Sequence, residues 1–67
     1  MSVNKRIKDA VLAGVKAKTI ATNSGVSYFR VSSVVNPKKY RGESKFNDEE
    51  AKRINDALDK IAQALAL

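Results

Sequence analysis

The segment from Ser24 to Asn36, SGVSYFRVSSVVN, concentrates side chains that can recognise a partner through hydrogen bonds and apolar contacts. It contains four serines, two adjacent aromatic residues and a final asparagine, but only one charged residue, Arg30. Hydroxyl and amide groups suit contacts with the edges of nucleic-acid bases or with phosphates, and aromatic rings suit contacts with the methyl group of thymine. These residue types therefore favour recognition over catalysis.

Catalytic and metal-binding chemistry has little support in this chain of 67 residues. Cysteine and histidine are absent, which excludes thiolate zinc sites, cysteine nucleophiles and the side chain most used for proton transfer near neutral pH. The carboxylates between residues 48 and 59 fit helix capping and solvation better than a metal site. We expect a protein that is not an enzyme and that uses no cofactor or metal.

The charge of the chain points to a polyanionic partner. Thirteen Lys and Arg residues against seven Asp and Glu residues give a net charge of +6, which favours nucleic acid first and an anionic membrane surface second. A basic membrane helix is disfavoured because the basic residues are split around a glycine turn, and no apolar run reaches the roughly 18 residues that span a bilayer. The absence of cysteine fits a reducing, cytoplasmic setting.

Four segments have apolar residues at helical spacing, and they predict a single all-α domain over residues 1–67. Gly25 is expected to form a tight turn after the second helix, Ser27 to cap the third, and Asn47 with Glu50 to cap the last. The third segment is rich in valine, so a strand is its alternative. The expected helices, each with its inward residues, are 3–13 (Val3, Ile7, Ala10, Val11), 17–23 (Ile20, Ala21), 27–35 (Val31, Val34, Val35) and 47–66 (Ala51, Ile54, Leu58, Ile61, Leu65).

Residues 37–46, PKKYRGESKF, are a basic connection between the third and fourth predicted helices. Asn36 precedes a proline and is expected to end the third helix. The connection is either a loop pinned by Tyr40 and Phe46 or a short hairpin that turns at Gly42. A helical turn within it would make five helices instead of four.

The spacing within residues 17–36 is that of a helix-turn-helix. This motif requires a short helix, a glycine turn and a second helix that is buried on its inner face. Any small helical hairpin could match two or three of the required positions, whereas six matches in a basic chain favour DNA binding. The matching residues are Ile20, Ala21, Gly25, Val26, Val31 and Val34.

The sequence GVSYFRVSSVVN resembles the helix-turn-helix of Lac-repressor-type headpieces, whose pattern is close to G-V-S-Y-x-T-V-S-R-V-V-N. The likeness covers about 20 of the 67 residues. The layout, with one helix before the motif and one after it, is more similar to the small bacteriophage repressors of the Cro and lambda-repressor type. The sugar-sensing domain of the Lac type has no counterpart here, so no small-molecule effector is implied.

The resemblance and the outward arc of the third helix together indicate which residues contact DNA. Ser33 stands where Lac-type proteins usually carry a guanine-reading arginine, so the operator of that family is not transferred. Phe29 has a partly buried core position as its alternative. The expected base-reading residues are Tyr28, Phe29, Ser32, Ser33 and Asn36, and the expected phosphate contacts are Lys16, Lys18, Thr19, Ser27, Arg30, Lys38, Lys39 and Arg41.

The sequence therefore predicts a transcriptional regulator of phage or prophage type, expected to be a repressor that reads the major groove of double-stranded DNA with residues 27–36. A homodimer on a pseudo-palindromic operator is expected, with Leu65 and Leu67 as candidate dimer contacts. The alternatives are an architectural protein of the excisionase type and a protein-interaction module such as an antitoxin or anti-repressor. The expected location is the cytoplasm of a bacterial cell or a phage-infected host.

Overall fold

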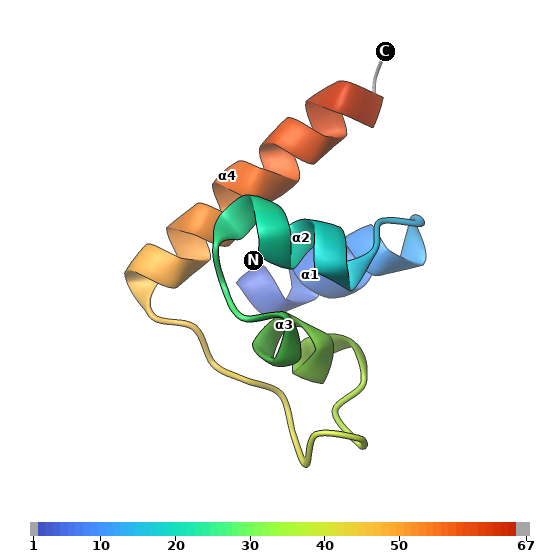
Figure 1. Cartoon of the computed structure of the whole chain (residues 1–67), viewed down its shortest axis with the longest axis vertical. Helices are drawn as coiled ribbons and strands as arrows, with labels where there is room; N and C mark the ends of the chain where they lie inside the picture. The colour runs from blue at the N-terminus through green and yellow to red at the C-terminus, as the bar shows by residue number, and fades with distance from the viewer. Residues whose placement is uncertain (1, 66–67) are drawn as a thin grey trace.

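The computed structural model of the protein describes residues 2–65, without the side chain of Leu65. It contains the helices α1 (Val3–Leu12), α2 (Ala17–Ser24), α3 (Tyr28–Val35) and α4 (Asp48–Leu65), shown in Figure 1. The described residues include no strand, so residues 28–35 are helical and the connection 37–46 is a loop with turns. The prediction of an all-α fold is confirmed, with four helices rather than five.

The core is built by one or two side chains from every helix. The α2 helix packs against both α3 and α4, and α1 also contacts α3 and α4. This packing holds the valine-rich α3 in a helix against its low intrinsic propensity. The buried apolar residues that form the core cluster are Ile7, Ile20, Ala21, Val26, Val31, Val34, Ile54 and Leu58.

Val35 does not join this core, contrary to the sequence-based expectation. Its side chain is 39% exposed, whereas Val31 and Val34 are fully buried. Val35 is the last residue of α3 and lies at the edge of a shallow groove with Lys8, Val11 and Leu12 of α1, where it is only partly covered.

The ends of the helices follow local signals in the sequence. Asn47 Oδ1 accepts the backbone N–H of Glu50 at 2.8 Å, and Glu50 Oε1 accepts the backbone N–H of Asn47 at 3.0 Å. This capping box confirms the predicted start of α4. Ser27 does occupy the position before α3, but its hydroxyl accepts no capping hydrogen bond. Ser27 therefore contributes no side-chain cap to that helix.

The α2 and α3 helices are joined by only three residues, 25–27. Gly25 has φ of 73°, in the left-handed region, and its N–H donates to the carbonyl of Ala21 at 2.9 Å. Val26 then turns inward and is 7% exposed, which anchors the connection to the core. This short connection fixes the start of α3 against α2.

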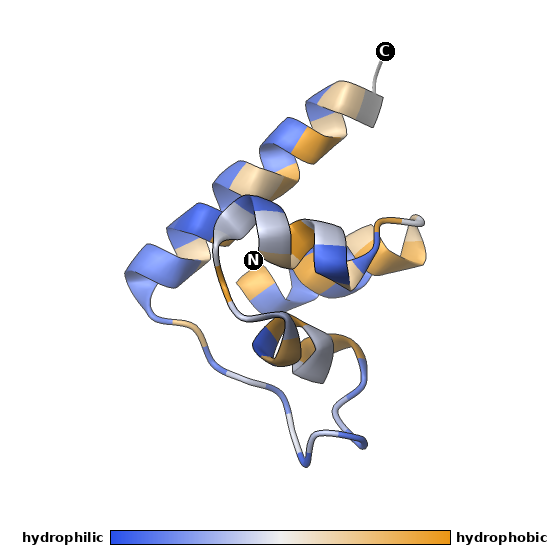
Figure 2. Cartoon of the chain, in the orientation of Figure 1, coloured by the Kyte–Doolittle hydropathy of each residue, from blue (hydrophilic) through white to orange (hydrophobic). Residues whose placement is uncertain are grey.

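The α4 helix has a hydrophilic beginning and an end that projects beyond the other helices (Figures 1 and 2). Asp48, Glu49 and Glu50 lie in its first turn, where carboxylates complement the helix dipole. Leu67, expected with Leu65 to form a dimer contact, lies outside the described residues, as does the Leu65 side chain. Within residues 2–65, no helix is long and apolar enough to cross a membrane.

The left-handed conformation of Gly25 gives a prediction for stability. A Cβ built at Gly25 meets no atom within 4 Å, so Gly25→Ala introduces backbone strain without a clash. We expect the substitution to lower the free energy of unfolding by about 1 kcal/mol, measured by urea denaturation. Gly25→Asn is the matched control and should cost less, because asparagine tolerates this conformation better. Equal stability of Gly25→Ala and the parent protein would contradict the assigned conformation.

Candidate functional site

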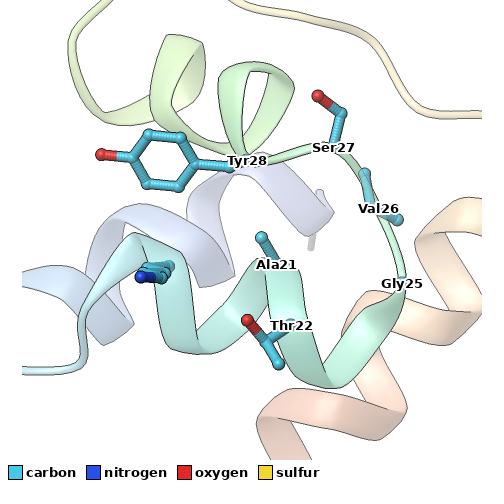
Figure 3. A pocket seen from close by; sticks show the side chains of 7 residues that line it. Ala21, Thr22, Gly25, Val26, Ser27 and Tyr28 are labelled. Atoms are coloured by element: carbon cyan, nitrogen blue, oxygen red, sulfur yellow. The ribbon is translucent and has the colours of Figure 1, made fainter.

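A groove of about 700 Å³ lies where α2 meets the start of α3 (Figure 3). Figure 3 shows Ala21 pointing from α2 toward α3, where its small side chain lets the two helices approach. The exposed residues Lys18, Thr22 and Ser27 bring an ammonium and two hydroxyl groups to the groove. These groups can donate hydrogen bonds to an oxygen-rich ligand. The complete lining is Lys18, Ala21, Thr22, Gly25, Val26, Ser27 and Tyr28.

An aromatic ridge, made of Tyr28, Phe29 and Tyr40, lies beside this groove. Tyr28 and Phe29 are 46% and 67% exposed. The ring centroids of Tyr28 and Phe29 are 5.8 Å apart, and those of Phe29 and Tyr40 are 6.5 Å apart, both in edge-to-face geometry. Phe29 is thus on the surface rather than in the core. From the sequence, Tyr28 and Phe29 were expected to read bases, whereas Tyr40 was expected only to pin the loop.

Ser32 and Ser33 are buried, contrary to the expectation that both face outward to read bases. They are 7% and 4% exposed. Ser33 Oγ lies 2.7 Å from the carbonyl oxygen of Arg30 and 2.8 Å from Ser44 Oγ, and it accepts the backbone N–H of Ser44 at 2.9 Å. Ser32 Oγ is buried without a hydrogen-bond partner among the described residues. The outward arc of α3 is therefore narrower than predicted, because the loop 37–46 folds back over Ser33.

Arg30, which was expected to contact phosphate, forms its contacts within the chain. Its guanidinium forms a two-pronged ion pair with Glu50, donates to the carbonyl of Lys45 at 2.7 Å and lies 4.8 Å from the centroid of the Phe46 ring. These hydrogen bonds from Arg30, together with the one from the Asn47 backbone, lower the pKa of the Glu50 carboxyl. Arg30 joins α3 to the start of α4 and offers no unpaired charge.

The loop 37–46 is fastened at its second half. Glu43 accepts hydrogen bonds from Lys8 Nζ at 2.8 Å and from Asn4 Nδ2 at 3.1 Å, and these contacts lower the pKa of the Glu43 carboxyl. Asn4 Nδ2 also donates to the carbonyl of Ser44 at 3.0 Å. With the bond between Ser33 and Ser44, these contacts hold the loop against α1 and α3.

The remaining predicted site residues are exposed on the surface. Asn36 ends α3, Lys16 precedes α2, and Thr19 lies on α2, where its carbonyl accepts a hydrogen bond from Asn23. Lys38, Lys39 and Arg41 lie in the turn of the loop, next to the aromatic ridge. The structure therefore brings most predicted contact residues to the surface, whereas Ser32 and Ser33 are buried and Arg30 is paired within the chain.

The ion pairs within the chain leave the net positive charge on the cations that have no carboxylate partner. Five cations and five carboxylates pair with each other, namely Lys5 with Asp9, Arg6 with Asp59, Lys8 with Glu43, Arg30 with Glu50 and Arg53 with Glu49. Eight cations and only two carboxylates, Asp48 and Asp56, have no such partner in the described part of the chain, and they account for the net charge of +6. The unpaired cations are Lys16, Lys18, Lys38, Lys39, Arg41, Lys45, Lys52 and Lys60.

Among residues 2–65, no group of three carboxylate, histidine or cysteine side chains is placed to hold a metal ion. In comparisons with known proteins, no family model, no curated sequence and no solved structure matches the chain. The chemistry of the site therefore rests on its own residues: hydroxyl groups, exposed rings and unpaired cations.

The adjacent serines of α3 give a matched pair of predictions with opposite signs. Ser32→Ala removes a buried hydroxyl without a partner, so the free energy of unfolding should rise by about 1 kcal/mol. Ser33→Ala leaves the N–H of Ser44 without its acceptor, so the free energy of unfolding should fall by about 1 to 3 kcal/mol. Urea denaturation of both variants measures this. A loss of stability in Ser32→Ala as large as that in Ser33→Ala would contradict the different environments.

The ion pair between Arg30 and Glu50 predicts a dependence of stability on pH. Because the pKa of Glu50 is lowered from 4.5 in the folded protein, ionised Glu50 stabilises the fold fully above that pH. This contribution is lost as the pH falls through the lower pKa of the folded state. We expect Glu50→Gln to be less stable than the parent protein at pH 7, with the difference shrinking below about pH 4.5. Urea titrations across this range measure it, and a difference that does not vary with pH would contradict the role of the charge.

Proposed function

We propose that the protein binds double-stranded DNA through a helix-turn-helix formed by α2, residues 25–27 and α3. The observation that carries this proposal is the exposure of Tyr28 and Phe29 on the first turn of α3, between two groups of unpaired cations. In such motifs, the N-terminal residues of the second helix contact base edges in the major groove. The short connection at Gly25 supports this role because it presents the first turn of α3 rigidly.

The contacts divide into base-reading and phosphate-binding groups. Tyr28, Phe29 and Asn36 are exposed along α3 and remain the candidates for reading bases. Phosphate contacts with Lys and Arg release counterions and supply affinity that does not depend on sequence. The candidates for these contacts are Lys16, Lys18, Thr19, Ser27, Lys38, Lys39 and Arg41, with Thr22 added by its place in the groove.

The burial of Ser32 and Ser33 has a consequence for specificity. A single copy offers few base-reading side chains, so useful discrimination requires two copies on a pseudo-palindrome with half-sites about 10 base pairs apart. We propose that the dimer on DNA acts as a transcriptional repressor of phage or prophage type, since a small domain can block a promoter by occupying it. The resemblance of residues 25–36 to Lac-type motifs supports this proposal.

Selection of bound genomic DNA fragments at two salt concentrations tests the proposal. A two-fold symmetric motif, bound about a thousandfold or more tighter than unrelated DNA, is the expected result. A flat profile with a steep dependence on salt would contradict specific regulation and favour an architectural role. An absence of DNA binding at low salt would favour a protein-interaction module instead.

The loop cations provide a variant with a matched control. The double substitution Lys38→Ala and Lys39→Ala should weaken binding to specific and unrelated DNA alike. It should also reduce the slope of log affinity against log salt by up to about 2, since each phosphate contact contributes roughly 1. The double substitution Lys52→Ala and Lys60→Ala removes the same charge from α4 and should leave the slope nearly unchanged. Fluorescence anisotropy measures both, and equal effects would contradict a localised interface.

A further inference from the structure

We propose that the aromatic ridge of Tyr28, Phe29 and Tyr40 binds the unpaired bases of single-stranded nucleic acid by stacking. Side chains from two separate segments, the first turn of α3 and the turn of the loop 37–46, meet to form the ridge. This activity is distinct from reading the edges of paired bases, and it does not depend on duplex binding.

The geometry of the ridge leaves ring faces open for a ligand. The interplanar angles are 68° between Tyr28 and Phe29 and 60° between Phe29 and Tyr40. In an edge-to-face pair only one ring uses a face, so each contact covers a single face. Phe29, the middle ring, is 67% exposed, so most of it is accessible to a ligand. Every nucleic-acid base has a flat face that can stack on such a ring.

The ridge is held in place before any ligand binds. The N–H of Gly42 donates to the carbonyl of Pro37 at 2.7 Å and closes the turn that carries Tyr40. The hydrogen bond from the backbone N–H of Ser44 to Ser33 Oγ and those from Asn4 and Lys8 to Glu43 then fasten the following residues to α3 and α1. Tyr40 therefore reaches Phe29 from a fixed turn, which reduces the entropy lost when a ligand is bound.

The charge around the ridge suits a phosphate backbone. Lys38, Lys39 and Arg41 surround Tyr40 in sequence, and Lys39 Nζ lies 5.6 Å from the centroid of the Tyr40 ring. The only carboxylate between residues 10 and 47 is Glu43, and it is paired with Lys8. Tyr28 and Phe29 are exposed and Tyr40 is half-buried. Aromatic rings beside a cationic track are the arrangement by which proteins bind single strands with little sequence preference.

Intrinsic fluorescence offers a direct measurement because the chain contains no tryptophan and two tyrosines, Tyr28 and Tyr40, which both lie in the ridge. The probe is a thymidine homopolymer of about 15 nucleotides, within the length that such surfaces accommodate. The control ligand is an abasic strand of the same length, which has the same phosphates but no bases. We expect the homopolymer to quench tyrosine fluorescence and to bind more tightly than the abasic strand.

Variants then separate stacking from charge. Phe29→Leu and Tyr40→Leu should each weaken homopolymer binding by about fivefold or more and leave abasic-strand binding unchanged, as measured by anisotropy of labelled strands. Phe29→Tyr keeps a ring and should retain binding. Leu12→Ala, at a residue that is 86% exposed on α1, is the control for loss of an exposed apolar side chain. Circular dichroism and urea denaturation confirm that each variant is folded.

Three results would overturn the proposal: equal affinity for the homopolymer and the abasic strand, full binding by the folded Phe29→Leu variant, or unchanged tyrosine fluorescence at saturation. The first result would leave a protein partner as the occupant of the ridge. Duplex DNA of the same length is measured in parallel. If the protein binds the homopolymer but not the duplex, the proposed regulator is refuted and the stacking site stands. If it binds the duplex but not the homopolymer, the stacking site is refuted and the proposed regulator stands.

Discussion

The carboxylate of Glu50 is the point on which the arrangement of α3, the loop 37–46 and α4 depends. It closes the capping box with Asn47 at the start of α4 and pairs with Arg30 of α3. Arg30 in turn holds the carbonyl of Lys45 and covers the Phe46 ring. A single carboxylate thus orders a helix start and fixes that start against the helix carrying the exposed rings. The second end of the long loop between them is held by this contact.

Ion pairing within the chain also explains why the positive charge of the molecule is distributed unevenly over its surface. Most carboxylates of α1 and α4, and that of Glu43, form ion pairs with cations on α1, α3 and α4. The start of α2 has no acidic neighbour in sequence, and Glu43, next to the turn of the loop, is paired with Lys8, so the cations of both segments stay unpaired. Internal pairing thereby localises the net positive charge of the chain on its unpaired cations. A polyanion approaching the protein meets this charge beside the groove and the aromatic ridge.

Much of the fold was predictable because its signals are local. Helical spacing placed all four helices, Gly25 marked the left-handed turn, and Asn47 with Glu50 marked the start of α4. Each of these signals acts over at most four residues, so the chain reveals it without tertiary information. The exposure of Tyr28 and Phe29 followed in the same way from the buried positions of Val31 and Val34.

The errors concern side chains whose partners lie far along the chain. Ser33 meets Ser44, eleven residues later, and Arg30 meets Glu50, twenty residues later. Periodicity could not show that the loop would return over α3, so Ser33 was interpreted as a surface residue. The expectation for Val35 was wrong for a different reason, because Val35 is the last residue of α3 and neighbouring side chains cover it only in part. The sequence gave no sign that Tyr40 joins the ridge, except that Tyr40 is an aromatic residue among basic ones.

The way in which the loop is fastened also bears on how this protein could be altered. Its second half is bound to α1 and α3 through Glu43 and Ser44, while the turn at Lys38 to Arg41 contributes no residue to the core cluster. Added residues in an exposed turn disturb little when the backbone on each side is held independently. Lengthening the turn would therefore leave the domain folded but move Tyr40 and the neighbouring cations away from Phe29.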